Sequence, residues 1–376
     1  MNTLTRVAVA FALLATSLPA LAASATVTRS WKYKPESSAG LTVRNLIGDV
    51  RIERGTEAGF HVTARATVEA DTQAEAERLA GLIEYRTADI GAGSRFDVAF
   101  PREHFRRIYY SGGYTSWWGA TYVEYLGERI RLTHDRDDAA AVRVDLVIRA
   151  PAGARLDVDN VFGESVANGF SGDLGLDGSS GLLRSTGGEG EVELDSGSGP
   201  VEVLGHRGRV RADTGSGGVR ISDCECEIDA DTGSGSVEVR GGSGRVRADT
   251  GSGRVTIERF AGSIEADTGS GSVRARDISA VRELDVDTGS GSVEIEGDLA
   301  ALERLRIDTG SGGVRLRSSG SPSIEIRVDT GSGGVDVDSP AASVRETGGV
   351  WTVRLGDGAG RGLIDTGSGS VDLVFP

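Results

Sequence analysis

The chain has 376 residues, of which 56 are glycine and 26% are charged, and its formal net charge is −15. Nucleic acid and anionic membrane surfaces repel so acidic a chain, so composition disfavours both as partners. This much glycine is typical of disorder, but here it recurs at a fixed interval among alternating apolar residues, which favours ordered repeats.

The first residues have the pattern of an export signal. Arg6 precedes an apolar stretch, Val7 to Leu18, and Ala20-Leu21-Ala22 forms a small-x-small cleavage site. The apolar stretch is too short for a stable membrane span, and no other run is apolar enough to cross. Residues 1–22 are therefore predicted to be a signal peptide, and the mature chain is predicted to have no transmembrane segment. We expect an exported protein, located in the periplasm, at the cell surface or in the medium.

Residues 23–150 are predicted to form a β-rich N-terminal cap with one short helix. Leu41–Asn45 and Gly48–Arg54 look like one coil of a repeat, and further alternating runs follow. Asp71 or Thr72 is expected to cap a helix over Gln73–Ile83. Such a cap would shield the first coil of a stack.

Ten aromatic residues lie between Phe96 and Tyr125, inside this predicted cap. Exposed aromatic rings on rigid loops suit sugar rings or a protein partner, so an envelope polysaccharide or a protein is the predicted ligand. The alternative is that these rings pack the cap onto the repeats, because large aromatic side chains are mostly buried. The candidate binding residues are Tyr109, Tyr110, Tyr114, Trp117, Trp118 and Tyr122.

The phrase Asp-Thr-Gly-Ser-Gly recurs through residues 151–376 at intervals that begin at 18 residues and then widen to about 20. Each copy is followed by a short alternating run, a second turn and another alternating run, which predicts two strands and two turns per repeat. The turn ladder is predicted at Asp195, Asp213, Asp231, Asp249, Asp267, Asp287, Asp308, Asp329 and Asp365, with a worn copy at Glu346.

The predicted fold is all-β: a parallel β-helix or β-solenoid of about eleven to twelve coils, each of 18–21 residues, behind the N-terminal cap. Coils stacked at about 4.8 Å would make a rod on the order of 55 Å long. The last strand, Ser370–Pro376, is expected to close the stack, because proline cannot extend a ladder.

The chain also resembles a family of exported bacterial proteins of unknown function that are described as adhesin-like β-strand-repeat proteins. The resemblance begins with a Leu-x-Val-x-Asn-x-x-Gly-x-Val opening, matched by Leu41, Val43, Asn45, Gly48 and Val50. It continues with an Arg-Ala-Pro-x-Gly-Ala-x-Leu-x-Val junction at Arg149–Val158 and with glycine-rich repeats. The resemblance implies a β-solenoid and no established activity.

Asp-Thr-Gly-Ser is also the catalytic phrase of aspartic proteases, in which two carboxylates share a proton. Many copies at coil spacing cannot each belong to such a pair, and a structural turn explains all of them. Asp would accept backbone N–H groups in an Asx-turn, Gly would supply a positive φ, and Thr and Ser would satisfy neighbouring turns. Bound Ca²⁺ is a further hypothesis, since stacked carboxylates repel, but the Asp that calcium-binding β-rolls place after their glycines is absent. We predict no metal site and no cofactor.

Two cysteines, Cys224 and Cys226, are separated by one residue. In an exported protein they could close a local disulfide, and the alternative is a pair of free thiols. No nucleophile elbow, phosphate loop or His-x-x-x-His pair is present. The sequence thus predicts a non-enzymatic envelope protein that acts as an adhesin, a scaffold or a ligand-presenting protein. The rival is a carbohydrate-active enzyme on a β-helix.

Overall fold

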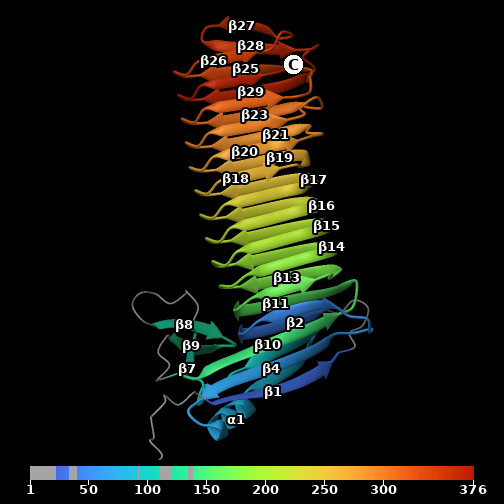
Figure 1. Cartoon of the computed structure of the whole chain (residues 1–376), viewed down its shortest axis with the longest axis vertical. Helices are drawn as coiled ribbons and strands as arrows, with labels where there is room; N and C mark the ends of the chain where they lie inside the picture. The colour runs from blue at the N-terminus through green and yellow to red at the C-terminus, as the bar shows by residue number, and fades with distance from the viewer. Residues whose placement is uncertain (1–22, 34–39, 92, 111–119, 134–138) are drawn as a thin grey trace, which may run out of the picture.

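The computed structural model describes residues 23–33, 40–91, 93–110, 120–133 and 139–376. The predicted signal peptide lies outside these residues. The described chain is almost entirely β-strand and forms a tall stack of coils on a broader base (Figure 1). None of its described helices is both long and apolar enough to span a bilayer.

Each coil contributes one strand to each of two faces, and every strand pairs in parallel with its counterparts in the neighbouring coils. On the first face the stacking order is β2 (Leu41–Ile47), β11 (Ala154–Phe162), β13 (Gly172–Gly178), the second halves of β14 (Leu183–Ser196), β15 (Val201–Thr214), β16 (Val219–Thr232) and β17 (Val237–Thr250), then β19 (Ala261–Thr268), β21 (Glu283–Thr288), β23 (Arg304–Thr309), β29 (Gly360–Thr366) and β25 (Ile324–Thr330). These twelve strands confirm the predicted β-solenoid and its number of coils.

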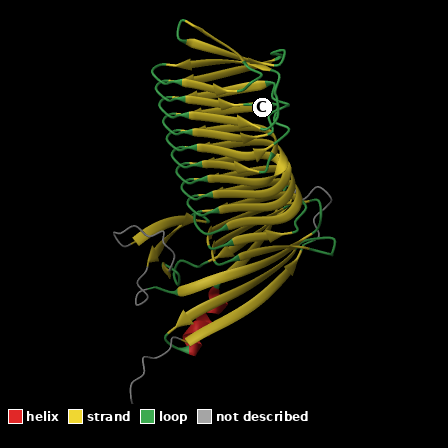
Figure 2. Ribbon diagram, turned by 45° about the horizontal axis from the view of Figure 1, so that its top comes forward, coloured by secondary structure: helices red, strands yellow, loops and turns green. Residues whose placement is uncertain are grey.

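The second face repeats this order with shorter strands. It runs through β3 (Val50–Arg54), β12 (Ser165–Asn168), the first halves of β14 to β17, β18 (Val255–Glu258), β20 (Val273–Ile278), β22 (Val293–Gly297), β24 (Val314–Ser318), β30 (Val371–Val374) and β26 (Val335–Asp338). The turns between the faces stack into columns along the edges of the rod (Figure 2).

The core is a thin layer of aliphatic side chains between the two faces. Because side chains alternate along a strand, every second residue points inward, and the same position repeats from coil to coil. One inward column on the second face consists of seven valines, each at most 2% exposed: Val201, Val219, Val237, Val255, Val273, Val293 and Val314. Arginine and glutamate alternate on the outer surface, as in the ion pairs of Arg220 with Glu202 and Glu238.

The base closes the N-terminal end of both faces. On the first face, β6 (Gly93–Ala99) pairs with β2, and β5 (Glu84–Ile90) pairs antiparallel with β6. On the second face, β10 (Ala141–Ala150) pairs with β3, followed by β4 (His61–Ala70) and β1 (Ala23–Lys32), both in antiparallel register. The helix α1 (Gln73–Leu82) packs on β1 and β4, and Thr72 rather than Asp71 caps it by accepting the Glu75 N–H.

The C-terminal end differs from the expected order. The coil made by β29 and β30 lies between the coil of β23 and β24 and the coil of β25 and β26. The prediction that Ser370–Pro376 closes the stack is therefore wrong, and Figure 1 shows β29 inside the rod. Glu346 is not a coil anchor either, because it lies in β27 (Ser343–Thr347), which forms an antiparallel hairpin with β28 (Val350–Leu355) against β25.

Candidate functional site

The predicted aromatic site is divided between core and surface. The rings of Phe96, Phe100, Phe105 and Tyr125 are buried, and the Tyr125 hydroxyl donates to the Val98 carbonyl over 2.7 Å, so these four residues belong to the core of the base. Tyr122 is 53% exposed and stacks under the Arg129 guanidinium. Tyr114, Trp117 and Trp118 lie outside the described residues. Tyr109 and Tyr110 are half-buried.

Tyr109 and Tyr110 come from a small side sheet that flanks the base. It consists of β7 (Arg107–Tyr109), β9 (Glu128–Thr133) and β8 (Ala120–Tyr125). The Tyr110 ring lies 4.7 Å from the Phe162 ring between centroids, and its hydroxyl is 3.1 Å from the Ser180 hydroxyl. These contacts hold the side sheet against the first coils of the rod.

A cleft of about 250 Å³ opens where this side sheet meets the base and the rod. Tyr109, Tyr110 and Phe162 supply its aromatic lining, and the Gly48–Asp49 turn between β2 and β3 supplies backbone. Gly48 is required there: its φ is +133°, and a Cβ would lie 2.0 Å from the Val144 carbonyl oxygen. The glycine lets the first turn of the rod sit directly on β10.

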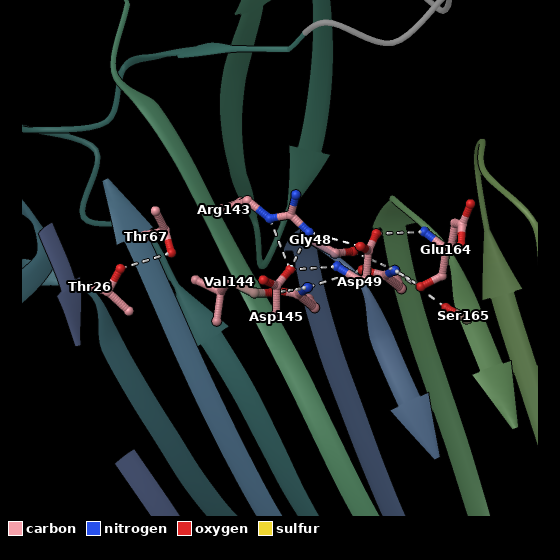
Figure 3. Close-up of polar contacts among 11 residues, drawn as sticks. Thr26, Gly48, Asp49, Thr67, Arg143, Val144, Asp145, Glu164 and Ser165 are labelled. Atoms are coloured by element: carbon pink, nitrogen blue, oxygen red, sulfur yellow. Dashed lines mark hydrogen bonds and ion pairs between the residues drawn. The ribbon is translucent and has the colours of Figure 1, made fainter. Parts of the chain in front are cut away.

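A network around Arg143 forms the polar wall of the cleft (Figure 3). Its guanidinium binds Asp49 over 2.8 Å and Asp145 over 2.6 Å. The backbone N–H groups of Asp49 and Glu164 donate to Asp145 and Asp49, over 3.0 and 3.2 Å. The hydrogen bond with Asp145, followed by the charges of the two carboxylates, raises the pKa of Arg143, so its charge is fixed at every physiological pH.

A second cleft continues from the first across the outer surface of the base. The two share Asp49, Thr67 and Arg143, and the second adds hydroxyl and guanidinium groups from Thr28, Thr63, Arg51 and Arg65. Thr67 also lies 3.4 Å from Thr26, between hydroxyl oxygens, on the same surface (Figure 3). We call the two clefts together the junction groove. It offers aromatic rings at one end and hydroxyl and guanidinium donors along its length.

The groove has the chemistry of a binding surface. Asp49 and Asp145 already accept hydrogen bonds from both Arg143 and backbone N–H groups. Among the described residues no group of three His, Cys, Asp or Glu side chains is placed to hold a metal ion. Sequence reasoning found Tyr109 and Tyr110 but missed Arg143 and Asp145. These two residues lie on a strand whose alternation of apolar and polar residues is the same as in the other strands.

The ladder aspartates stand in one column, as predicted, but the predicted hydrogen-bonding role belongs to the threonines beside them. Asp213 pairs with Asp231, and Asp231 with Asp249, along the first face. In the turn, Thr250 Oγ1 donates to the Gly235 carbonyl of the previous coil over 2.8 Å and accepts the Gly253 N–H over 3.0 Å. The same pair of bonds recurs at Thr214, Thr232, Thr268, Thr288 and Thr309.

The Asp side chains project to the outer edge of the rod instead. Partial burial, followed by the charges of Asp249 and Asp213, raises the pKa of Asp231. Most of the other ladder positions with a shifted pKa show the same causes, burial first and stacked neighbours second. The predicted Asx-turn role of Asp was thus wrong, because stacking places Thr, and not Asp, on the inward side. The predicted turn role of Thr is confirmed, whereas the predicted positive φ is not found at turn glycines such as Gly251 and Gly253.

Both cysteines are free thiols, buried at the second corner of the coils. Cys224 stacks in an inward column with His206 of the previous coil and Gly242 of the next, and Cys226 stacks between Gly208 and Gly244. Hydrogen bonding to Cys224, and then burial, raises the pKa of the Cys226 thiol. Here the free-thiol alternative is the one that the structure contains.

Comparison with known proteins finds a family that part of the repeat region resembles. Residues 244–376 match the model of the family described as Toastrack DUF4097. No curated protein matches the chain. Among solved structures, a candidate cell adhesion protein from Clostridium sporogenes is 9% identical, with 93% of this chain and 99% of that chain covered and a TM-score of 0.20.

A candidate adhesin from Bacteroides fragilis is 12% identical, with 73% of this chain and 97% of that chain covered and a TM-score of 0.31. With TM-scores this low, neither structure supports a fold or a function for this chain. The match over residues 244–376 agrees with the resemblance drawn from the sequence motifs, because this part of the chain is similar to the Toastrack DUF4097 family.

Proposed function

We propose that this protein is an exported, non-enzymatic, adhesin-like solenoid that binds a saccharide or a protein of the cell envelope in the junction groove. The observation that carries the proposal is the groove itself, in which two tyrosines adjoin a fixed arginine between two carboxylates. Sugar rings are bound in this way, with one face against an aromatic ring and hydroxyl groups on charged hydrogen-bonding partners.

The rigid rod supports a presenting role. Its strands are hydrogen-bonded from coil to coil along both faces, so the groove is attached to a long stiff body. The export signal predicted over residues 1–22 supports an envelope location. N-terminal sequencing of the protein recovered from the periplasm or the medium tests this part, and a protein retained in the cytoplasm with residue 1 intact contradicts it.

Binding to a panel of purified envelope polysaccharides and surface proteins tests the groove. Tyr109→Ala and Arg143→Ala are expected to weaken binding about tenfold or more, since each removes a central contact. Tyr122→Ala is the matched control, because this exposed tyrosine lies on β8 and does not line the groove. If Tyr109→Ala and Arg143→Ala weaken binding no more than Tyr122→Ala does, at unchanged melting temperature, the binding site lies outside the groove.

The same panel separates binding from catalysis. Cleavage of any polysaccharide on the panel would replace this proposal with that of a carbohydrate-active enzyme. Trp117→Ala with Trp118→Ala tests the remaining predicted aromatic residues, and loss of binding without loss of stability would extend the site to them.

A further inference from the structure

We propose that the C-terminal coil, β29 with β30, is an exchange element that two copies of this chain can trade. The coil fills what we call the slot, the space between the coil of β23 and β24 and the coil of β25 and β26. In the chain it directly follows neither of these two coils, because β27 and β28 come before it. The coils of β14 to β17, by contrast, follow one another directly in the chain.

The register of the slot suits this coil on both sides. Asp365 lies between Asp308 and Asp329, and Thr366 lies between Thr309 and Thr330. On the second face, Val371 lies between Val314 and Val335. The turn must also be glycine, because a Cβ at Gly369 would lie 1.9 Å from the Gly312 carbonyl oxygen.

One position makes the fit specific to residues 360–374. Gly362 lies between Leu305 and Ile326, at an inward position that Ile264 and Leu284 occupy in earlier coils. A Cβ at Gly362 would meet Ile326 Cγ1 at 2.9 Å, so the Ile326 side chain fills the space that the glycine leaves. The other coils have valine, leucine or isoleucine at this position, and each of these side chains would have to displace Ile326 in the slot. The chemically matched occupant is therefore the same coil of a second copy.

Exchange would preserve every contact that the coil makes. The hydrogen bonds that hold it include Arg361 N to Glu303 O over 2.8 Å, Val314 N to Ser370 O over 2.9 Å, and Arg315 to Asp372 over 2.8 Å. All of them join the coil to the slot, so they form equally well when the two belong to different chains. Two glycines with positive φ, Gly356 at 58° and Gly358 at 69°, lie in the connection Gly356–Ala359 that leads into β29 and can re-route it.

Cysteine cross-linking between full-length chains tests the proposal. One preparation carries Arg315→Cys, in the slot, and the other carries Asp372→Cys, in the coil. The two are mixed, unfolded and refolded together at several concentrations, and then oxidised. We expect a dimer linked between positions 315 and 372, in a yield that rises with concentration, because adjacent strands bring Cα atoms within disulfide range. Peptide mapping identifies the link.

The matched control mixes Arg315→Cys with Glu294→Cys. Positions 294 and 315 are neighbours in the same way, but on β22 and β24, whose coils follow one another in the chain. This mixture is expected to give only background dimer. The double variant Arg315→Cys with Asp372→Cys shows that the link can form within one chain. If the double variant links but the mixture stays at the control level, exchange does not occur; if the double variant fails to link, the coil does not occupy the slot, and the proposal falls as well.

Discussion

In the middle of the repeat region, buried side chains at equivalent positions lie next to one another from coil to coil, as in the valine column of the second face. In the base, contacts are made once: Arg44 binds the buried Asp97 through two hydrogen bonds, and the Trp31, Tyr85 and Phe96 rings pack together. The difference teaches that the repeats depend on backbone proximity, whereas the base depends on particular side chains. Added bulk should therefore destabilise the repeats more than the base. Removal of a side chain should destabilise the base more than the repeats.

The largest expected effect comes from adding one methyl group to the turn column of the repeats. In Gly253→Ala the new Cβ would lie 1.7 Å from the Gly235 carbonyl oxygen, so the coils must part. We expect a loss of about 3 kcal/mol in the free energy of unfolding, measured by chemical denaturation. Gly81→Ala is the control in the base, where nothing lies within 4 Å, and should stabilise α1 by about 0.5–1 kcal/mol. Equal effects of the two would contradict the comparison.

Removing a side chain should matter most in the base. Arg44→Ala removes the bidentate partner of Asp97, whose side chain is 7% exposed, and among the described residues leaves it the Arg95 ion pair at 3.2 Å. The expected loss is about 2 kcal/mol, the cost of a buried charge that has lost hydrogen bonds. Arg209→Ala removes an ion pair with Glu227 on the rod, where both side chains are more than half exposed, and should cost about 0–1 kcal/mol. A larger loss for Arg209→Ala than for Arg44→Ala would contradict the claim that particular side chains matter most in the base.

The threonine column gives a smaller effect. Thr250→Val keeps the shape but leaves the Gly235 carbonyl and the Gly253 N–H without their hydroxyl partner. The expected cost is about 1–2 kcal/mol. Thr256→Val, at an outward position of β18, should change stability by less than about 0.5 kcal/mol. Thermal melts of both variants check the prediction, and indistinguishable melting temperatures would show that the hydroxyl ladder contributes nothing.

The smallest effect concerns the acidic column and depends on pH. Burial, followed by the charges of its stacked neighbours, raises the pKa of Asp231 in the folded state. The contribution of this carboxyl group to stability is therefore fully present below its unfolded pKa and is lost as the pH rises through its folded pKa. Asp231→Asn should thus stabilise the protein at neutral pH, by less than about 1 kcal/mol, and lose this advantage near pH 4. Denaturation at both pH values measures it. An advantage that stays constant between them would mean that charge repulsion is not its cause.

The sequence was sufficient for those parts of the fold that are local or periodic. The Asp-Thr-Gly-Ser-Gly phase predicted the turns, the alternating runs predicted the strands, and α1 followed from its cap and apolar side. It was not sufficient for the order of the last coils. Asp308, Asp329 and Asp365 begin the same phrase, so the repeat motif does not indicate which coil lies on which.

The junction groove was only partly predictable for a similar reason. Tyr109 and Tyr110 stood out by composition, but the partners of the polar wall are remote in the chain: Arg143 and Asp49 are separated by 94 residues. Their meeting depends on β10 pairing with β3 beneath the first turn, and single-chain alternation carries no information about which strands pair.

The position of β29 and β30 has a consequence for how the rod is completed during synthesis. A polypeptide is made from its N-terminus, so residues 324–338 exist before residues 360–374, yet they occupy the outer position. Residues 324–338 must either remain unpaired until β29 and β30 are made, or pair first with β23 and β24 and later be displaced from them. In both routes the tip is assembled out of temporal order, which makes its closure the late step and leaves an open strand edge for as long as the newest residues are missing.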